Sequence, residues 1–299
     1  MVLGSLFTVK AICALRRLKS EHRLKEQRLS EKEDFHQEIH EANIAVHQIE
    51  ATYYSLFHPE VYSKQEQKRL TLTIRQIDRL VTDNHKKALD FGAGTGNLSE
   101  KLLDLGYKVT AVDISPAMCK VLRRQYASQV DAGVLTVINA PIEDIDFQNE
   151  EFDLVTCYSV LHHLPDYENT LRRLCGFLKK GGVMFLDHEA SPYFWRAESG
   201  ILATLVKSLY FHTNPMLNSF YFGIIGFKVP TVDYSLSDYW FKREHALSHQ
   251  QIQQIFKKCN FKSYTRTDYY LRESWIYNPI FWTYKHLCSP ETSYWIATK

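Results

Sequence analysis

The sequence has no closely spaced cysteines, no large charge of one sign and no apolar run long enough to cross a membrane. None of its six cysteines lies in a C-x-x-C pair, so zinc-finger and redox-motif interpretations have no support. The 36 basic and 34 acidic residues nearly balance, which gives no electrostatic case for a nucleic-acid partner. Scattered thiols in a chain of 299 residues are typical of reduced proteins, so we expect a cytoplasmic location.

The first fifteen residues, MVLGSLFTVKAICAL, are apolar but too few for a spanning helix, which needs about 20 apolar residues. They lack the basic start of a signal peptide, and the basic run RRLK follows them. We expect a terminal helix that packs its apolar side, with weak contact to an anionic membrane surface as the alternative.

Residues 16–50 contain no glycine or proline and are rich in Arg, Lys, Glu and Gln. This composition predicts a long helix with a solvated, mixed-charge face and no chemical role. A second helix is predicted from about Lys64 to Val81.

From Lys87 the pattern alternates between strands and helices. The apolar runs KALDFG, KVTAVD, VLTVINA, FDLVTCYS and GVMFLDHE predict strands, with helices between them. Ser115 and Pro116 mark the start of one of these helices. The alternation predicts an α/β fold with a doubly wound, mostly parallel sheet, whose ligands bind at the carboxyl ends of the strands.

The final third of the chain differs in composition. All five tryptophans and 25 of the 40 aromatic residues follow Pro192. The helical spacing of Ile201, Leu202, Leu205 and Leu209 predicts an amphipathic helix within an insertion. An aromatic lining suits a ring or an acyl chain. The alternative roles for this insertion are a hydrophobic plug at the sheet edge and a dimer contact. The second of these would make the protein a homodimer.

The stretch LDFGAGTGNL, residues 89–98, is the strongest functional signal. Dinucleotide-binding loops have the spacing G-x-G-x-x-G, whereas Gly92, Gly94 and Gly96 give G-x-G-x-G. Asp90 stands before the first glycine, where a carboxylate repels a pyrophosphate but attracts a cation. S-adenosylmethionine has no phosphate and carries an ammonium and a sulfonium, so it is the predicted cofactor. Asp113 ends the next strand, where a carboxylate can hold both hydroxyls of a ribose.

The stretch ALDFGAGTGNLSEKLLDLGYKVTAVDISPAMC, with FDLVTCYSVLHHLPD and LKKGGVMFLDHE, resembles class I S-adenosylmethionine-dependent methyltransferases. Within them it is similar to the ubiquinone/menaquinone-biosynthesis-like branch (methyltransferase type 11). SHQQIQQIFKKCNFKSYTRTDYY and YWIATK are similar to the family's last helix and strands. The resemblance implies a Rossmann-like sheet of seven strands, with N-terminal helices and a helical, aromatic-rich insertion after the fifth strand.

The resemblance also implies roles for individual residues. Asp90 meets the methionine ammonium directly or through water, and Asp113 holds the ribose. Tyr54 closes over the methionine end, although Ser55 stands where an aspartate is usual. Pro141 replaces the aspartate that often contacts the adenine, which leaves that contact to Ile142 and to Glu143 or Asp144. The remaining cofactor-binding residues on this basis are Gly92, Ala93, Gly94, Gly96, Ile114, Tyr158 and Ser159.

A general base is needed only if the acceptor keeps its proton, as a hydroxyl does. Candidates follow the fourth and fifth strands: His163, His188 and Glu189. A structural role is the alternative for one member of the pair His162 and His163, and for His188. No metal site is expected. The predicted function is methyl transfer to a largely hydrophobic small molecule (quinone, isoprenoid, lipid or aromatic metabolite). A sugar or glycan acceptor and a catalytically silent cofactor-binding module are the alternatives.

The expected division of the chain has four parts. They are an N-terminal helical extension over 1–50, a cofactor-binding core over 51–192, an acceptor-binding insertion or lid over 193–240, and a C-terminal completion of the sheet over 241–299.

Overall fold

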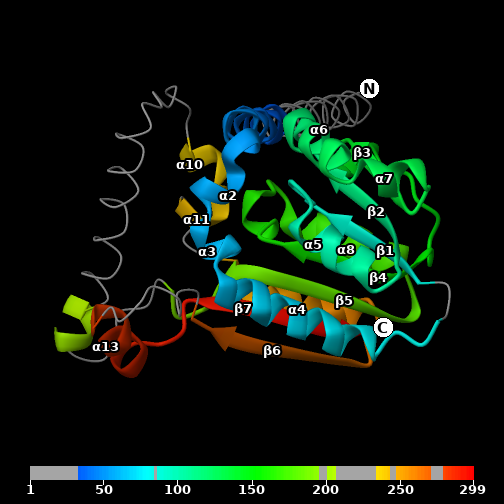
Figure 1. Ribbon diagram of the computed structural model, residues 1–299. Helices are drawn as coiled ribbons and strands as arrows, with labels where there is room; N and C mark the ends of the chain where they lie inside the picture. Colours follow the sequence, from blue (N-terminus) through cyan, green and yellow to red (C-terminus); the bar gives the residue numbers. More distant parts are fainter. Residues whose placement is uncertain (1–32, 84–85, 195–200, 207–233, 243–246, 271–278) are drawn as a thin grey trace, which may run out of the picture.

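The computed structural model describes residues 33–83, 86–194, 201–206, 234–242, 247–270 and 279–299. They form a seven-stranded sheet in the order β3-β2-β1-β4-β5-β7-β6 (Figure 1). Strands β1 to β5 are parallel, while β7 pairs antiparallel with β5 and β6. The predicted doubly wound, mostly parallel sheet is therefore confirmed. The strands span Lys87–Phe91 (β1), Lys108–Asp113 (β2), Leu135–Asn139 (β3), Phe152–Tyr158 (β4), Leu178–Ala190 (β5), Ser263–Tyr269 (β6) and Thr292–Thr298 (β7).

Helices of very different length surround the sheet. The longer ones are α4 (Lys64–Asp78), α5 (Asn97–Asp104), α6 (Pro116–Gln125), α8 (Tyr167–Phe177), α12 (His249–Lys258) and α13 (Pro279–Leu287). The short ones are η1 (Ala51–Tyr53), α2 (Tyr54–Phe57), α3 (Pro59–Tyr62), α7 (Ala127–Asp131), η2 (Ile142–Asp144), η3 (Leu161–His163), α10 (Tyr234–Ser237) and α11 (Tyr239–Lys242). Among the residues described, no helix combines the length and the apolar character needed to cross a membrane.

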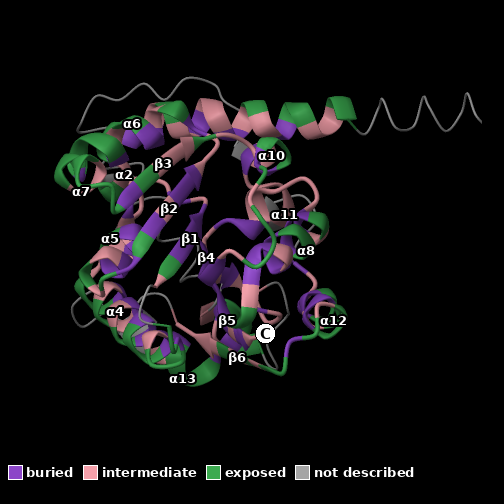
Figure 2. Cartoon of the chain, turned by 90° about the vertical axis from the view of Figure 1, so that its right-hand side faces the viewer, coloured by how far each residue is buried: buried purple, intermediate pink, exposed green. Residues whose placement is uncertain are grey.

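Buried side chains form two large cores, one on each face of the sheet. The central strands β1, β4 and β5 are largely buried between them, whereas β3 and β6 are not (Figure 2). Leu70, Leu102 and Leu122 bring α4, α5 and α6 to one face. Leu171 and Phe256 bring α8 and α12 to the other. Each fully buried side chain of this size contributes about 1.5–3 kcal/mol to folding, so these two layers fix the strand ends in place.

The predicted start of α6 is confirmed. The Ser115 hydroxyl accepts a hydrogen bond from the N–H of Met118 at 3.4 Å, and Pro116 lies in the first turn. Such a cap satisfies an N–H that the first turn would leave unpaired. Because β2 ends at Asp113, the cap also fixes the chain directly after that carboxylate.

A helix formed by residues 33–50 lies over the carboxyl ends of the strands. The expectation of a helix with a solvated face is confirmed for these residues, and the opposite side of the helix is buried. Asn43 is only 4% exposed: its Nδ2 donates to the main-chain oxygen of His163 at 3.1 Å, and its Oδ1 accepts from the Ser237 hydroxyl at 3.0 Å. The helix is thereby tied to the loop after β4 and to α10.

Most of the predicted lid falls outside the described residues. Residues 201–206 are helical, as the spacing predicts, and the side chains of Ile201, Leu202 and Leu205 are exposed. Residues 1–32, which include the predicted apolar terminal helix, also lie outside the described part of the chain.

Candidate active site

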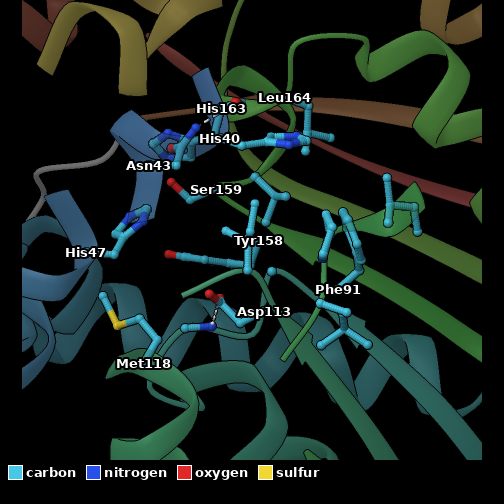
Figure 3. A pocket seen from close by; sticks show the side chains of 18 of the residues that line it. His40, Asn43, His47, Phe91, Asp113, Met118, Tyr158, Ser159, His163 and Leu164 are labelled. Carbon is cyan, nitrogen blue, oxygen red and sulfur yellow. Dashed lines mark hydrogen bonds between the residues drawn. The ribbon is translucent and has the colours of Figure 1, made fainter. Parts of the chain in front are cut away.

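A pocket opens at the carboxyl ends of β1 to β4, beneath the helix of residues 33–50 (Figure 3). Its cavity is about 90 Å³, which is room for a few water molecules. Ligands of doubly wound sheets bind where the strand order reverses, which here is between β1 and β4. The lining residues are His40, Asn43, His47, Tyr54, Phe91, Gly92, Gly94, Val112, Asp113, Ile114, Met118, Ala140, Pro141, Ile142, Tyr158, Ser159, Val160, His163 and Leu164.

Three glycines with left-handed backbone shape the loop after β1. A Cβ at Gly92 (φ +70°) would lie 2.3 Å from Cγ2 of Val160, and one at Gly96 (φ +96°) would lie 2.2 Å from Cδ1 of Leu122. These two positions therefore require glycine. Gly94 (φ +54°) has no atom within 4 Å on its Cβ side. Since Gly94 lines the pocket, a ligand can lie directly against its backbone.

The N–H groups of Gly92, Ala93 and Gly94 are already bonded within the protein. Gly92 and Ala93 both donate to the main-chain oxygen of Val112, at 2.8 and 3.0 Å, and Gly94 donates to a carboxylate oxygen of Asp113 at 2.8 Å. Phosphate-binding loops instead point such N–H groups at the ligand. The loop geometry therefore favours a ligand without a phosphate.

Asp113 lies at the end of β2 and lines the pocket. One of its oxygens accepts from Gly94 and the other accepts from the N–H of Ser115 at 2.8 Å. Each carboxylate oxygen keeps further acceptor capacity, so Asp113 can also accept from two neighbouring hydroxyls. Burial raises the pKa of Asp113, while His47 and the two N–H donors lower it.

Asp90 lies behind the loop and does not line the pocket. It is 1% exposed and accepts hydrogen bonds from the hydroxyls of Ser99 at 2.6 Å and Thr156 at 3.0 Å. Burial raises the pKa of Asp90 to about 6, although these hydrogen bonds act in the opposite direction. Asp90 thus joins β1 to α5 and β4, and its direct contact with a cofactor ammonium stays a prediction.

The structure brings together part of the predicted set. Among the residues that line the pocket are Tyr54, Gly92, Gly94, Asp113, Ile114, Ile142, Tyr158, Ser159 and His163. The residues that do not line it are Asp90, Ala93, Gly96, Glu143, His188 and Glu189. Glu143 is exposed on η2, whereas Pro141 and Ile142, beside it, line the pocket.

Three residues that the sequence did not indicate enter the pocket from the helix of residues 33–50: His40, Asn43 and His47 (Figure 3). Their spacing of three and four residues places them on one side of the helix. This helical spacing is the one sequence feature that could have indicated that the three residues act together. However, polar residues lie on every side of a mixed-charge helix. The side that faces a pocket can be identified only when the neighbouring strands are known.

One residue after β4 and one residue within β5 have backbone conformations that are rare for residues other than glycine. Ser159 has φ +59° and His188 has φ +62°. Such conformations cluster at functional sites, where the surrounding structure holds them. The pairing of β5 with β7 shifts register between Leu186 and Glu189, so a bulge contains His188. Here Nδ1 of His188 lies 3.0 Å from the Tyr158 hydroxyl.

Glu189 is engaged behind the loop that follows β4. Its Oε1 accepts from the N–H groups of Val160 and Leu161 at 3.0 and 2.8 Å, and its Oε2 lies 2.8 Å from Nδ1 of His162. The residue is 1% exposed. These contacts tie the end of β5 to η3, and the catalytic role expected for Glu189 stays a prediction.

His163 lines the pocket as a neutral imidazole. Its Nδ1 lies 2.7 Å from the main-chain oxygen of Ser237. Because a carbonyl only accepts, Nδ1 carries the hydrogen and Nε2 keeps a lone pair. Burial lowers the pKa of His163 well below its ordinary value. His162, His163 and Asp238 also place three potential metal ligands within 4.8 Å of one another, so the expected absence of a metal stays a prediction.

His188 has the same tautomer for a different reason. The Tyr158 hydroxyl donates its hydrogen to Oε1 of Glu66 at 2.9 Å, so it must accept from Nδ1–H of His188. Nε2 of His188 therefore also keeps a lone pair. Burial lowers the pKa of His188 to about 4, which leaves the ring neutral at pH 7.

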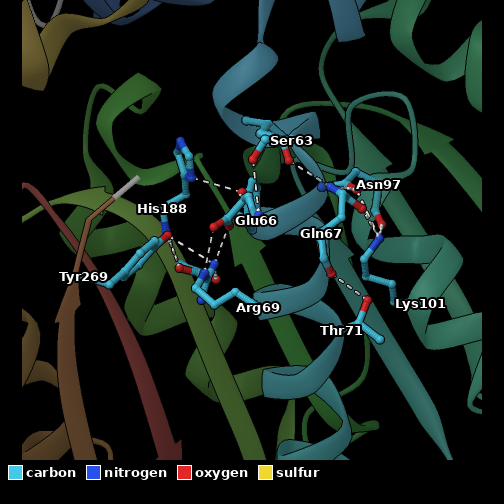
Figure 4. A network of polar contacts seen from close by, with 12 residues as sticks. Ser63, Glu66, Gln67, Arg69, Thr71, Asn97, Lys101, His188 and Tyr269 are labelled. Atoms are coloured by element: carbon cyan, nitrogen blue, oxygen red, sulfur yellow. Dashed lines mark hydrogen bonds and ion pairs between the residues drawn. The ribbon is translucent and has the colours of Figure 1, made fainter. Parts of the chain in front are cut away.

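Arg69 of α4 joins two buried carboxylates beside His188 (Figure 4). Its Nε donates to Glu66 at 2.8 Å and its Nη2 donates to Asp187 at 2.6 Å. The Tyr269 hydroxyl donates to Asp187 at 2.9 Å, and the Tyr269 ring lies 4.0 Å from the guanidinium carbon. Burial raises the pKa of Asp187 to about 6, against the lowering effect of Arg69. This network fastens α4 and β6 to the end of β5.

Tyr54, which lines the pocket, is held by a charged histidine. The rings of Tyr54 and His58 have centroids 4.3 Å apart. The two ring nitrogens of His58 each lie 3.1 Å from a carboxylate, one of Glu50 and one of Glu60. Burial lowers the pKa of His58, but the two carboxylates outweigh it and raise the pKa to about 9. The ring is therefore an imidazolium at pH 7.

Comparison with known proteins bears on the same part of the chain. Residues 89–186 match the family described as a methyltransferase domain. A stretch of 104 residues is 40% identical to the ubiquinone biosynthesis O-methyltransferase of Xanthomonas oryzae pv. oryzae (strain PXO99A), and covers 34% of this chain and 42% of that protein. The enzyme of Xanthomonas campestris pv. campestris (strain B100) matches to the same extent. This chain thus spans less than half the length of these relatives.

Among solved structures, a chain from the complex between the Haloferax volcanii Trm112 methyltransferase activator and a methyltransferase has a TM-score of 0.53. The match has 13% sequence identity and covers 84% of this chain and 96% of that chain. This likeness supports the fold.

The residues present fit S-adenosylmethionine. The backbone is open at Gly94, Asp113 has acceptor capacity for two ribose hydroxyls, and the N–H groups of Gly92, Ala93 and Gly94 are bonded within the protein rather than directed at a phosphate. The family match covers this loop and both strands beside it. Residues 89–186 of this chain therefore match a methyltransferase domain whose loop and strand ends fit S-adenosylmethionine.

Proposed function

We propose that this protein is an enzyme that transfers the methyl group of S-adenosylmethionine to a hydroxyl group of a largely hydrophobic small molecule. One observation carries the proposal. The pocket that holds the available carboxylate of Asp113 also contains His163, a neutral imidazole whose Nε2 keeps a lone pair. The relatives that match the cofactor-binding part are named O-methyltransferases, which agrees with a hydroxyl acceptor.

The apolar part of the lining supports a hydrophobic acceptor. Ile114, Met118, Val160 and Leu164 line the pocket. The aromatic-rich segment after Pro192 follows β5, whose carboxyl end lies at the same edge of the sheet. Apolar walls with a few convergent polar groups are typical of small-molecule sites.

The cofactor supplies a methyl group already activated by its sulfonium, so the protein mainly has to orient the acceptor and exclude water. Orientation alone can contribute roughly 7–11 kcal/mol to catalysis. A hydroxyl acceptor must lose its proton, and Nε2 of His163 is the assigned acceptor because His163 lines the pocket. His188 is the second candidate, separated from the cavity by Tyr158.

One observation favours the alternative of a sugar or glycan acceptor. His40, Asn43 and His47 add polar groups to the roof of the pocket, and hydroxyl-rich ligands need such partners. A catalytically silent binding module is the third alternative. A cytoplasmic location, weak membrane-surface contact and a homodimer stay predictions.

Turnover with a panel of hydroxylated isoprenoid, aromatic and sugar acceptors tests the proposal. We expect S-adenosylhomocysteine to form with an apolar hydroxylated acceptor. His163→Gln should lower kcat by roughly 10²–10⁴ while cofactor Kd is retained. His188→Gln is the matched comparison, and the larger kcat loss identifies the base. Methylation of sugars alone would favour the glycan alternative, and cofactor binding with no turnover on any acceptor would favour the silent module.

A further inference from the structure

A second groove lies at the opposite edge of the sheet from the candidate active site. Its cavity is about 480 Å³, and its lining residues lie on α8, precede β4, begin β5 or follow α12 and β7. They are Glu150, Arg172, Cys175, Gly176, Lys180, Cys259, Asn260, Lys262 and Lys299. The active-site pocket lies at the carboxyl end of β4, so the length of the seven-residue strand, roughly 20 Å, separates the two.

Two cysteines from different helices meet in this groove. Cys175 belongs to α8 and is 1% exposed, whereas Cys259 caps the C-terminus of α12 and is partly exposed. Helices α8 and α12 pack against each other, and both thiols belong to the same core region. The sequence gives no hint of this pairing, because the two residues are far apart along the chain.

The groove is basic around the more accessible thiol. Arg172, Lys180, Lys262 and Lys299 line it, with Glu150 as the acidic residue among its lining. Lys299 is held close to the pair, because its Nζ donates to the main-chain oxygens of Cys175 and Leu178 at 2.9 and 2.8 Å. Cationic groups favour the thiolate, which is the nucleophilic form of cysteine.

The two thiols differ in acidity. Hydrogen bonding to Cys175 lowers the pKa of Cys259 to about 7, with Lys299 and Arg172 acting in the same direction and burial acting against them. The same hydrogen bond, together with burial, raises the pKa of Cys175. The pair thus combines an accessible thiolate with a buried protonated thiol.

We propose that Cys259 and Cys175 form a peroxide-reactive pair, in which Cys259 is oxidised first and Cys175 then closes a disulfide between α12 and α8. The Cys259 thiolate attacks a hydroperoxide; an S–O bond forms, the O–O bond breaks, and the peroxide leaves as alkoxide or hydroxide. The Cys175 thiol then attacks the resulting sulfenic acid, an S–S bond forms, and water leaves with the Cys175 proton. This inference is independent of the acceptor of the methyl group.

The test uses the full chain with hydrogen peroxide and peptide mapping without reductant. We expect a cross-link between the peptides that contain Cys175 and Cys259, a mass loss of two hydrogens, and reversal by dithiothreitol. Because the link joins distant parts of the chain, Tm should rise by several degrees. Cofactor affinity should stay the same, because the groove lies at the other edge of the sheet.

Single variants separate the two roles. Cys175→Ser should trap Cys259 as a sulfenic acid that reacts with dimedone, whereas Cys259→Ser should leave Cys175 unmodified at the same peroxide dose. Cys288→Ser, a change at another buried cysteine, should still form the cross-link.

A measurement on the unaltered protein covers the case in which a variant fails to fold. The alkylation rate of Cys259 should reach half its maximum near pH 7, and at pH 7 it should be roughly tenfold above that of a thiol with ordinary pKa. No cross-link at saturating peroxide, a dominant link between other cysteines, or an alkylation midpoint near pH 9 would each overturn the proposal.

Discussion

Asp113 and Asp187 lie at the same edge of the same sheet, but they have different surroundings and therefore different roles. Asp113 contacts two main-chain N–H groups and lines a cavity, so it retains acceptor capacity for a ligand. Asp187 is fully buried and is surrounded by the guanidinium of Arg69, the hydroxyl of Tyr269 and the N–H of His188. Carboxylates of equal chemistry become a binding group or a structural anchor according to whether protein donors already use their oxygens.

The largest expected effect is a loss of stability when Arg69, the cation that pairs with Asp187, is removed. Arg69→Met leaves the buried carboxylates of Glu66 and Asp187 without their cation, and breaking a buried pair typically costs about 3–5 kcal/mol. We expect a loss of this size in the free energy of unfolding, measured by urea denaturation. The matched control is Arg75→Met, at an exposed position of the same helix, which should change stability little. Equal losses in both variants would show that the contacts of Arg69 with Glu66 and Asp187 do not stabilise the fold.

Replacement of Asp113 should lower cofactor affinity and leave the fold intact. Asp113→Ala removes two hydrogen bonds to ribose hydroxyls, each worth about 1.5 kcal/mol or more, so cofactor Kd should rise by about a hundredfold. Isothermal titration calorimetry with S-adenosylhomocysteine measures this, and circular dichroism checks the fold. Asp131→Ala, at an exposed carboxylate on α7, should leave Kd unchanged. An unaltered Kd in Asp113→Ala would exclude the residue from the site.

The pH dependence of stability tests the role of a third buried carboxylate, Asp90. Its folded-state pKa of about 6 lies above the ordinary 3.8, so the folded protein binds more protons than the unfolded chain between these values. Stability should therefore fall as pH rises from about 4 to 6. Asp187 contributes in the same window, so Asp90→Asn should flatten only part of the slope. One of the hydroxyls of Ser99 and Thr156 can still donate to the amide oxygen, and the other can accept from the amide N–H. An unchanged slope in urea denaturation across this range would contradict the assignment.

The smallest effect should come from His58. Its pKa is raised to about 9, so its stabilising contribution is fully present below pH 6.5 and is lost as pH rises through 9. The ring is partly exposed, so we expect about 1 kcal/mol. Thermal denaturation of His58→Gln from pH 6 to 10 should show a weaker decline in Tm than the unaltered protein. His40→Gln, whose histidine lies on the roof of the pocket, is the matched comparison and should keep the full decline.

The cofactor loop could be predicted from sequence because its requirements are local. Gly92 and Gly96 need left-handed backbone at sites where a Cβ would collide with a neighbour, and Ser115 needs only three residues to form its cap. Strand periodicity and helix length gave the order of elements for similar reasons. These features depend on backbone geometry within a few residues, so a single sequence carries them.

Contacts between distant segments could not be predicted in this way. The helix of residues 33–50 shows no sequence signal that it lies over the strand ends, yet it brings His47 beside Asp113 and fastens Asn43 to the loop after β4. Glu189 looked catalytic by position, but the N–H groups of Val160 and Leu161 occupy its carboxylate.

The sequence by itself determined the order of strands and helices, the glycine loop and the identity of the cofactor class, because spacing along one chain sets backbone conformation and local charge. Only the tertiary structure decided which side chains share the pocket, which tautomers His163 and His188 adopt, and that Cys175 meets Cys259. The physical reason is that burial and hydrogen-bond partners set protonation and reactivity, and those partners come from residues far apart in the chain.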